Sequence, residues 1–259
     1  MQLLVDIGNS TIVFALAGKD GEITQTWRFK TMKGETNSFF PYELKSSLKK
    51  LGIETSEIKS ISISSVVPEI NGHIIQSIKD ITGVEPQIFS LQDAMRVIDI
   101  DVEAPAGLGK DRLADAIGAA LCYGVPAIVI DMGTATTIGI VNKDRCFIGG
   151  MIIPGAKTSL KALSHKASQL PMINLEKPSG IIGRNTQECM QSGVLYGNAA
   201  MVDGIIDRIM PDLEGEVKII ATGGLARQII PLCRHQILID DNLLFKGLYL
   251  ATKDATNEN

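Results

Sequence analysis

Apolar residues in this chain gather into short runs that end at a carboxylate followed by glycine. The first run stops at Asp6, turns through Gly8 and Asn9, and then resumes. That pattern is typical of two antiparallel strands joined by a tight hairpin, with Asp6 at the end of the first strand. A second copy, about half the chain away, places Asp131 beside Gly133. We therefore expect a fold of two similar halves, each with a carboxylate beside a glycine turn.

Elsewhere in the chain, segments whose apolar residues have the spacing of a strand alternate with segments that have the spacing of a helix. The pattern predicts further strands at 23–29, 58–67, 87–89, 127–130, 146–154, before Thr222 and at 236–239. It predicts helices at 42–51, 69–81, from 109 onward, around 160–167 and at 185–210, 225–232 and 242–252. Residues 32–41, the stretch that leads to Val102 and residues 170–182 have no clear period. Strands that alternate with helices indicate an α/β fold.

The repeated design also predicts where the chain divides. We expect an N-terminal half over residues 1–118, a C-terminal half over 119–252 and a polar tail over 253–259. A tail of that composition is expected to fray.

The two glycine turns suit the binding of phosphate. Without a Cβ at Gly8 or Gly133, a ligand can approach the backbone closely, and the turn amides can surround an anion. A neighbouring carboxylate cannot hold phosphate itself, but it can hold a cation that bridges to phosphate. The alternative is a simple hairpin with a solvated aspartate. Hydroxyl donors also lie in or beside these turns at Ser10, Thr11, Thr134, Thr136 and Thr137.

Two further stretches fit the same chemistry. Gly223 and Gly224 follow a predicted strand, where a flat group such as a base or ribose can lie against the backbone. The helix that follows Gly109 carries Asp111 and Arg112 in its first turn, and a helix start favours bound anions. Arg112 can therefore pair with a substrate carboxylate. Alternatively, Asp111 only caps the helix and Arg112 is a surface charge.

Composition narrows the class of protein. The formal charge of −4 over 259 residues gives no electrostatic case for nucleic acid. No apolar run approaches the ~18–20 residues that span a bilayer, and Asp6 interrupts the first run too early for a signal peptide, so we expect no membrane association and a cytoplasmic location. A disulfide framework, a zinc site or a histidine-based triad is not expected, because the four cysteines are widely spaced and the three histidines show no partner spacing.

Seven stretches resemble, in family order, the motifs of the type III pantothenate kinases, within the superfamily of acetate kinase, sugar kinases, heat-shock chaperone ATPases and actin. They cover nearly the whole chain. The resemblance implies two ribonuclease-H-like halves, built as duplicated βββαβαβα units, with an ATP cleft between them. The stretches are Asp6–Ser10, Ser65–Pro68, Gly109–Arg112, Asp131–Thr137, Gly149–Gly155, Gly183–Thr186 and Thr222–Gly224.

The same resemblance implies the reaction and its residues. It implies that ATP phosphorylates pantothenate to 4'-phosphopantothenate, the first step of coenzyme A biosynthesis, with Asp111 as the general base. Asp6 is expected to face Mg²⁺, Asp131 to bind a monovalent cation (K⁺ or NH₄⁺), and the chain to form a homodimer. The ATP site is implied at Asp6, Ile7, Gly8, Asn9, Ser10, Thr11, Ile12, Val13 and Thr134, and the pantothenate site at Gly109, Lys110, Asp111, Arg112 and Thr186.

At three positions the chain differs from the residues usual in that family. Lys110 stands where a small or apolar residue is usual, Val102 where a tyrosine is frequent, and Gly139 where an aspartate is usual. Two other interpretations are therefore kept. One is a kinase or phosphatase of the same superfamily that acts on another small alcohol or polyphosphate, and the other is a non-catalytic regulatory relative.

Overall fold

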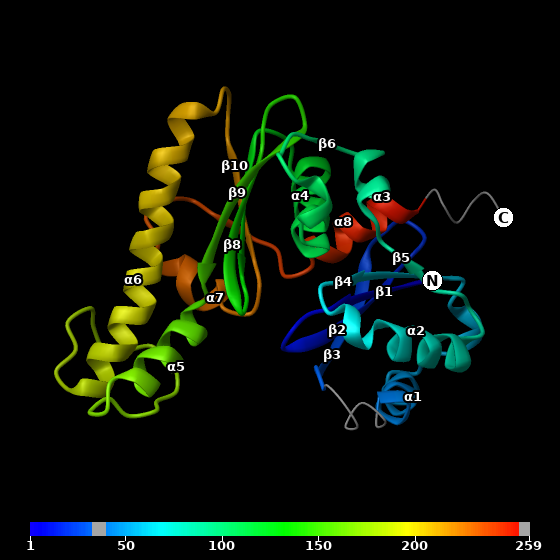
Figure 1. Cartoon of the computed structure of the whole chain (residues 1–259), viewed down its shortest axis with the longest axis horizontal. Coiled ribbons are helices and arrows are strands. Elements are labelled where there is room, and N and C mark those ends of the chain that lie inside the picture. The colour runs from blue at the N-terminus through cyan, green and yellow to red at the C-terminus, as the bar shows by residue number, and fades with distance from the viewer. Residues whose placement is uncertain (33–39, 254–259) are drawn as a thin grey trace. The chain divides into compact units, whose positions relative to one another are not determined.

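The structure is a computed structural model that describes residues 1–32 and 40–253 (Figure 1). Its contacts divide the chain into two compact units. The first unit contains residues 1–99, 103–122 and the segment from Asn242 onward, and the second contains Ile100–Val102 and Tyr123–Asp241. The contacts thus assign the last helix to the first unit. The division at residues 118 and 119, which rests on the repeated sequence design, stays a prediction.

The first unit is built on a five-stranded sheet with the order β3-β2-β1-β4-β5. β1 pairs antiparallel with β2 and parallel with β4, and these pairings set Asp6 between Val13 and Ser64. The predicted hairpin that contains Asp6 is therefore confirmed. The strands are β1 (Gln2–Ile7), β2 (Thr11–Ala17), β3 (Ile23–Lys30), β4 (Ser60–Ser65) and β5 (Gln87–Ile88).

Helices cover both faces of this sheet. Buried side chains of α1 and α2, such as Leu44 and Ile74, pack in one core with Val5 and Phe14 of the sheet. On the other face α8 contacts β1 and β4, and it also packs along α4. The helices of this unit are α1 (Phe40–Lys50), α2 (Pro68–Thr82), α3 (Leu91–Met95), α4 (Lys110–Cys122) and α8 (Leu243–Thr252).

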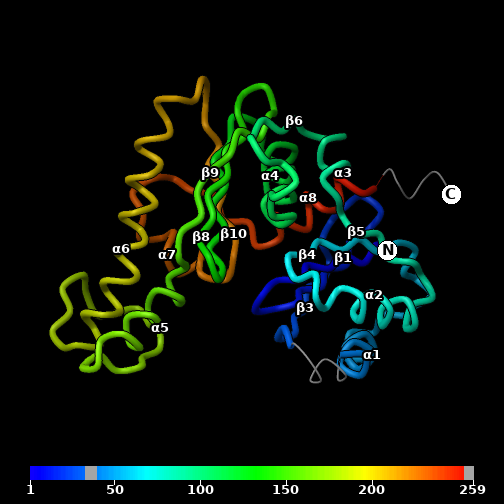
Figure 2. The backbone as a smooth tube through the Cα atoms, viewed as in Figure 1, coloured from blue at the N-terminus to red at the C-terminus, as the bar shows by residue number. Residues whose placement is uncertain are grey.

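Two features fix the C-terminal helix α8 in the first unit. Gly118 and Gly247 face the opposite helix so closely that a Cβ on Gly118 would lie 2.5 Å from the Leu243 carbonyl oxygen. In addition, Gln2, Ser62 and Thr252 form a buried hydrogen-bonded network: Ser62 Oγ donates to Thr252 Oγ1 over 2.9 Å, and Gln2 Nε2 donates to Ser62 Oγ over 2.9 Å. The red C-terminal end of the tube thus returns to the blue first strand (Figure 2).

The second unit repeats the first sheet. Its strand order is β11-β10-β7-β8-β9, with β6 added at the β9 edge. β7, β8 and β9 are antiparallel neighbours, and β10 runs parallel to both β7 and β11. Two sheets with one strand order and one set of directions confirm the predicted pair of ribonuclease-H-like halves. The strands are β6 (Asp99–Ile100), β7 (Ala127–Met132), β8 (Ala135–Val141), β9 (Cys146–Pro154), β10 (Lys218–Thr222) and β11 (Leu238–Ile239).

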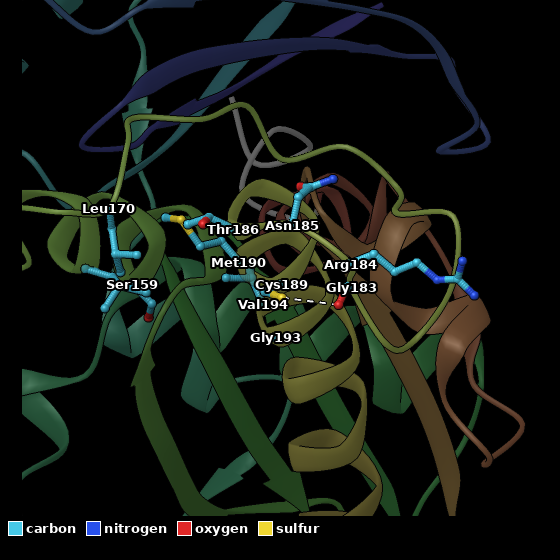
Figure 3. Close-up of a pocket in the computed structure, with 11 residues that line it drawn as sticks. Ser159, Leu170, Gly183, Arg184, Asn185, Thr186, Cys189, Met190, Gly193 and Val194 are labelled. Carbon is cyan, nitrogen blue, oxygen red and sulfur yellow. Dashed lines mark hydrogen bonds between the residues drawn. The ribbon is translucent and has the colours of Figure 1, made fainter.

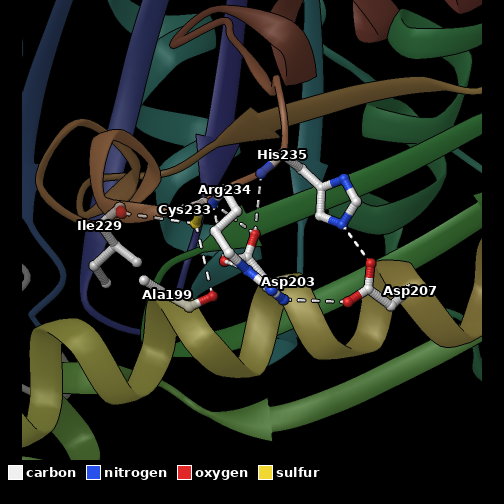
Figure 4. Close-up of polar contacts among 7 residues, drawn as sticks. All are labelled: Ala199, Asp203, Asp207, Ile229, Cys233, Arg234 and His235. Atoms are coloured by element: carbon white, nitrogen blue, oxygen red, sulfur yellow. Dashed lines mark hydrogen bonds and ion pairs between the residues drawn. The ribbon is translucent and has the colours of Figure 1, made fainter.

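The helices of the second unit are α5 (Ala156–Lys166), α6 (Thr186–Ile209) and α7 (Ala226–Ile229). The buried Asp203 of α6 holds the segment before β11, because its two carboxylate oxygens accept the backbone N–H of Arg234 over 2.9 Å each and one of them accepts that of His235 (Figure 4). One turn further on, Asp207 contacts the side chains of Arg234 and His235. Burial, with a contribution from the Asp203 carboxylate, raises the pKa of the nearby Cys233 thiol to about 12.

The structure departs from the predicted elements in a few places. A helix at Leu91–Met95 and the strand β6 lie in the stretch that leads to Val102, where no period was evident. A capping box between Ser90 and Asp93 starts that helix. The predicted helix at 225–232 is divided, because Pro231 cannot continue an α-helix and a 3₁₀ turn follows α7.

Part of two predicted segments lies outside the described residues. These are positions 33–39 of the expected loop at 32–41 and positions 254–259 of the expected tail. The first α-helix begins at Phe40, two residues before the predicted start. Within residues 1–32 and 40–253, no helix is both long and apolar enough to cross a bilayer.

Candidate active site

The first glycine turn is a closed hairpin between β1 and β2. The Gly8 N–H donates to the Thr11 carbonyl over 3.0 Å, and the Thr31 hydroxyl donates to the Gly8 carbonyl over 2.6 Å. A Cβ on Gly8 would lie 3.1 Å from the Thr11 oxygen, which is closer than an ordinary contact. Asn9 and Ser10 are exposed at the tip. The turn therefore presents a rigid backbone and two polar side chains to a ligand.

The eight residues from Asp6 to Val13 differ in how they can reach a nucleotide. Ile7 and Ile12 are buried in the core of the first unit and pair with each other and with the neighbouring strands, so they support the turn. Asp6 and Val13 face each other across the β1–β2 pair and are partly exposed. The structure thus places a carboxylate at the base of the turn and hydroxyl and amide groups at its tip.

The start of α4 holds the predicted pantothenate-site residues of the first unit. Asp111 lies in the first turn, and one of its carboxylate oxygens accepts the N–H of Arg112 over 2.8 Å. A Cβ on Gly109 would overlap that same oxygen, so the glycine makes room for the carboxylate. Desolvation lowers the pKa of the half-buried Arg112 guanidinium, while the charge of Asp111 opposes the shift.

This geometry bears on the two interpretations of Asp111. The bond to the neighbouring amide is what a helix-terminal residue makes. A carboxylate has lone pairs for about four hydrogen bonds, however, so this contact leaves Asp111 able to accept a substrate proton. The Asp111 side chain can therefore bind the amide at the helix start and also act as a general base.

The second glycine turn, between β7 and β8, is supported from α5. The Gly133 N–H donates to the Ala135 carbonyl over 2.9 Å, and Thr158 Oγ1 donates to the Thr134 carbonyl over 2.7 Å. Gly155, which precedes α5, donates its N–H to the same carbonyl over 3.2 Å. A Cβ on Gly155 would lie 2.5 Å from the Gly133 oxygen. Thr134 is therefore fixed by two partners that the sequence interpretation did not assign.

The third turn meets the second at Asp131. A Cβ on Gly223 would overlap the Asp131 carboxylate and lie 2.6 Å from the Met132 nitrogen, and Gly223 has φ +91°. The Leu225 N–H donates to the Met132 carbonyl over 3.2 Å. Within the second unit, the turn at Gly223, where a base or ribose is expected to lie, thus packs directly against Asp131, the expected cation ligand.

Thr186 lies in a cavity of about 680 Å³ between α5, the segment that precedes α6 and the first turns of α6 (Figure 3). Asn185 starts α6 by accepting the Glu188 N–H over 2.9 Å, which confirms the predicted helix start. Glu188 in turn accepts the Arg184 N–H over 2.9 Å. Ser159, Leu163 and Leu170 line the opposite wall, with Gly183, Cys189, Met190, Gly193 and Val194 completing the cavity.

The predicted site residues therefore fall into two groups. In the first unit lie the hairpin from Asp6 to Val13 and the α4 start with Gly109, Lys110, Asp111 and Arg112. In the second unit lie Asp131, Thr134 and Thr186. Within the second unit, α5 connects the second glycine turn with the cavity of Thr186. Thr158 of this helix supports the turn, and the next residue, Ser159, lines the cavity. The sequence could have indicated Gly155 as a supporting residue, because it ends the Gly149–Gly155 motif. Nothing in the sequence indicated Thr158.

The donor set suits a divalent cation that travels with a nucleotide. Residues 1–32 and 40–253 contain no group of three or more His, Cys, Asp or Glu side chains placed to hold a metal ion. Mg²⁺ commonly takes one or two carboxylates and completes its shell with phosphate oxygens and water. A single carboxylate such as Asp6, beside a turn that is expected to bind phosphate, fits this way of binding Mg²⁺.

Two sheets of one topology, each with a carboxylate beside a glycine turn, define the superfamily fold of sugar kinases and actin-like ATPases. Solved structures agree. The chain is similar to the ADPNP-bound activator of 2-hydroxyisocaproyl-CoA dehydratase from Clostridium difficile, at 13% identity and a TM-score of 0.57 over 99% of this chain and 96% of that chain. It is also similar to a Campylobacter jejuni protein described as a Baf family transcriptional activator, at 21% identity and a TM-score of 0.56 over 98% and 99%.

Sequence comparison narrows the class further. The chain belongs to the type III pantothenate kinase family, whose sequence model matches residues 2–208. The type III pantothenate kinase of Halalkalibacterium halodurans is 37% identical over 253 residues, which cover 98% of this chain and 99% of that protein.

Proposed function

We propose that this chain transfers the γ-phosphoryl group of ATP to the primary hydroxyl of pantothenate and so starts coenzyme A biosynthesis. One observation carries the proposal. A type III pantothenate kinase matches the chain over 98% of its length, and the sequence contains Asp6, Asp111, Asp131 and Thr186 within the motifs that carry the resemblance. Two of the three departures concern the pantothenate site: Lys110 alters the shape or charge of that pocket, and Val102 stands where a family tyrosine contacts the substrate. No role is assigned to the aspartate that Gly139 replaces.

Within this proposal, ATP supplies the phosphoryl group and the chain orients and neutralises it. The hairpin from Asp6 to Val13 holds the nucleotide phosphates, Asp6 faces the accompanying Mg²⁺, and Thr134 contacts ATP. Because phosphoryl transfer has a loose transition state, positioning and charge neutralisation matter more than the strength of the base.

The acceptor is held by the residues at the α4 start and by Thr186. Arg112 pairs with the pantothenate carboxylate, and the partial burial of its guanidinium strengthens that pairing because less water competes. Asp111 accepts the proton of the primary hydroxyl as that oxygen bonds to the γ-phosphorus and the bond to the ADP oxygen breaks. Asp131 binds K⁺ or NH₄⁺ beside the second and third turns.

The assembly is proposed to be a homodimer. Its basis is the resemblance to the type III pantothenate kinases, which implies a homodimer. Large apolar side chains of the second unit, such as Ile152, Met172, Ile181 and Ile182, are exposed and could take part in such a contact. Sedimentation of the intact chain should give twice the monomer mass of 27.8 kDa.

A coupled assay of ADP release tests the activity. With MgATP, pantothenate and KCl, the chain should turn over and produce 4'-phosphopantothenate, as identified by mass spectrometry. Binding of ATP without turnover on pantothenate would instead support the regulatory relative. Turnover only on a different alcohol would support another kinase of the superfamily.

A further inference from the structure

The serine hydroxyls of β4 are not equivalent. Ser62 donates a hydrogen bond to Thr252 and accepts one from Gln2, and Ser65 donates to Asn71 over 2.6 Å. Ser64 lies between them and is 0% exposed, yet its Oγ has no hydrogen-bond partner. A buried hydroxyl without a partner is unfavourable, because it has lost its bonds to water and gained none in return. Alanine would fill this position at no such cost.

The register of the sheet places this hydroxyl beside the first carboxylate. Ser64 on β4 is the parallel partner of Asp6 on β1. Register partners on neighbouring strands, about 4.8 Å apart, point their side chains to the same face of the sheet. The Ser64 hydroxyl is therefore adjacent to the Asp6 side chain and needs only a rotation about its Cα–Cβ bond to point toward it.

The second unit contains the same arrangement. Thr222 on β10 is the parallel partner of Asp131 on β7, and it is also buried, at 6% exposed. Each unit thus sets a buried hydroxyl beside the carboxylate that precedes its glycine turn. A feature kept at the matching position of both sheets argues that the hydroxyl serves the carboxylate.

We propose that Ser64 is a positioning residue for Asp6. Its hydroxyl donates a hydrogen bond to the Asp6 carboxylate when that carboxylate faces the Mg²⁺ that accompanies the nucleotide, and so fixes the side chain in the binding orientation. The inference rests on the proposed function, which assigns Asp6 to the metal–nucleotide complex. The unfavourable burial in the free protein is then offset when the nucleotide is bound.

The test compares Ser64→Ala with the matched variant Ser62→Ala. Calorimetric titration with MgATP and urea unfolding are measured for both, in the full chain. Ser64→Ala should be as stable as the parent or more so, and should bind MgATP roughly ten- to hundredfold more weakly, the effect of losing a hydrogen bond to a charged group. Ser62→Ala should show the reverse, with lower stability and unchanged affinity.

A cycle with Asp6→Asn separates this inference from the proposed function. If Ser64 acts through Asp6, adding Ser64→Ala to Asp6→Asn should weaken MgATP binding no further. Affinity unchanged in Ser64→Ala while Asp6→Asn binds poorly would overturn the role of Ser64 alone. Affinity unchanged in Asp6→Asn would overturn the assignment of Asp6 itself. A loss of stability in Ser64→Ala without loss of affinity would show that the hydroxyl is only structural.

Discussion

Gly223 packs against the carboxylate of Asp131 so closely that a Cβ on the glycine would overlap a carboxylate oxygen. The contact joins the third glycine turn to the second within one unit. It also means that the position of the proposed cation ligand depends on a residue more than ninety positions later in the chain.

The first prediction concerns that contact. Gly223→Ala must displace Asp131 and hold a left-handed φ of +91°, so we expect at least about 2 kcal/mol lower stability and a loss of K⁺ stimulation. Thermal unfolding and the KCl dependence of the rate measure the two effects. Gly224→Ala is the stability control, since nothing lies within 4 Å of its added Cβ. Equal unfolding temperatures for the two variants would contradict the argument.

The second prediction concerns the general base. Asp111→Asn keeps the size of the side chain but cannot accept the proton, so kcat should fall by roughly 10²–10⁴ while the affinity for ATP stays near that of the parent. Initial rates at saturating pantothenate and nucleotide titration test this. Asp144→Asn, which changes an exposed aspartate near the β8–β9 turn, should leave both quantities unchanged. A kcat near the parental value would exclude Asp111 as the base.

The third prediction concerns the monovalent cation. Activity should be lost after exchange into a buffer whose cation is a bulky amine, and addition of KCl or NH₄Cl should restore it. Asp131→Asn should not be restored by either salt, because the ligand charge is gone. If the parent keeps full activity without K⁺ and NH₄⁺, Asp131 has another role.

The fourth prediction uses the raised pKa of Cys233. A thiol reacts as its thiolate, and the Cys233 pKa of about 12 leaves only about one part in 10⁴ ionised at pH 8. Reactivity at Cys233 should appear only as the pH rises toward that value. Iodoacetamide at pH 8 should therefore label the exposed Cys122 and Cys189 and spare Cys233, as peptide mass spectrometry can show.

The same experiment reports on the cavity. Because Cys189 lines the cavity of Thr186, bound pantothenate should slow its labelling and leave that of Cys122 unchanged. Equal labelling rates at Cys189 with and without pantothenate would argue against a substrate site there.

The fifth prediction concerns the buried network at the end of α8. Thr252→Val removes the hydroxyl that accepts from Gln2 and Ser62, which should lower the free energy of unfolding by about 1–3 kcal/mol. Urea unfolding measures the change. Thr26→Val, on the exposed side of β3, should cost much less. Similar losses in both variants would mean that the network adds little.

Much of this fold was predictable because its central strands are short apolar runs that end at a glycine turn. β2 and β8 both follow a carboxylate and a glycine turn, and both turns appeared where the pattern placed them. Short elements such as α3 were not predicted, because five residues do not establish a helical period. The capping box of Ser90 and Asp93 could have indicated this helix.

The supporting contacts of the candidate site were harder to foresee. Thr158 reaches the Thr134 carbonyl from 24 positions away, and the place of Ser64 beside Asp6 follows from strand pairing rather than from any local motif. Turn chemistry is local and can be read from neighbouring residues. Contacts between distant segments depend on which strands become neighbours.

The network of Gln2, Ser62 and Thr252 has a consequence for how the protein is made. A ribosome releases the strand that holds Gln2 well before the segment that holds Thr252, so the first unit stays incomplete until that segment has been made. The second unit, apart from Ile100–Val102, is continuous from Tyr123 to Asp241 and has all its own strands earlier. The half encoded later is thus the one able to fold first on the ribosome, reversing the usual N-to-C order.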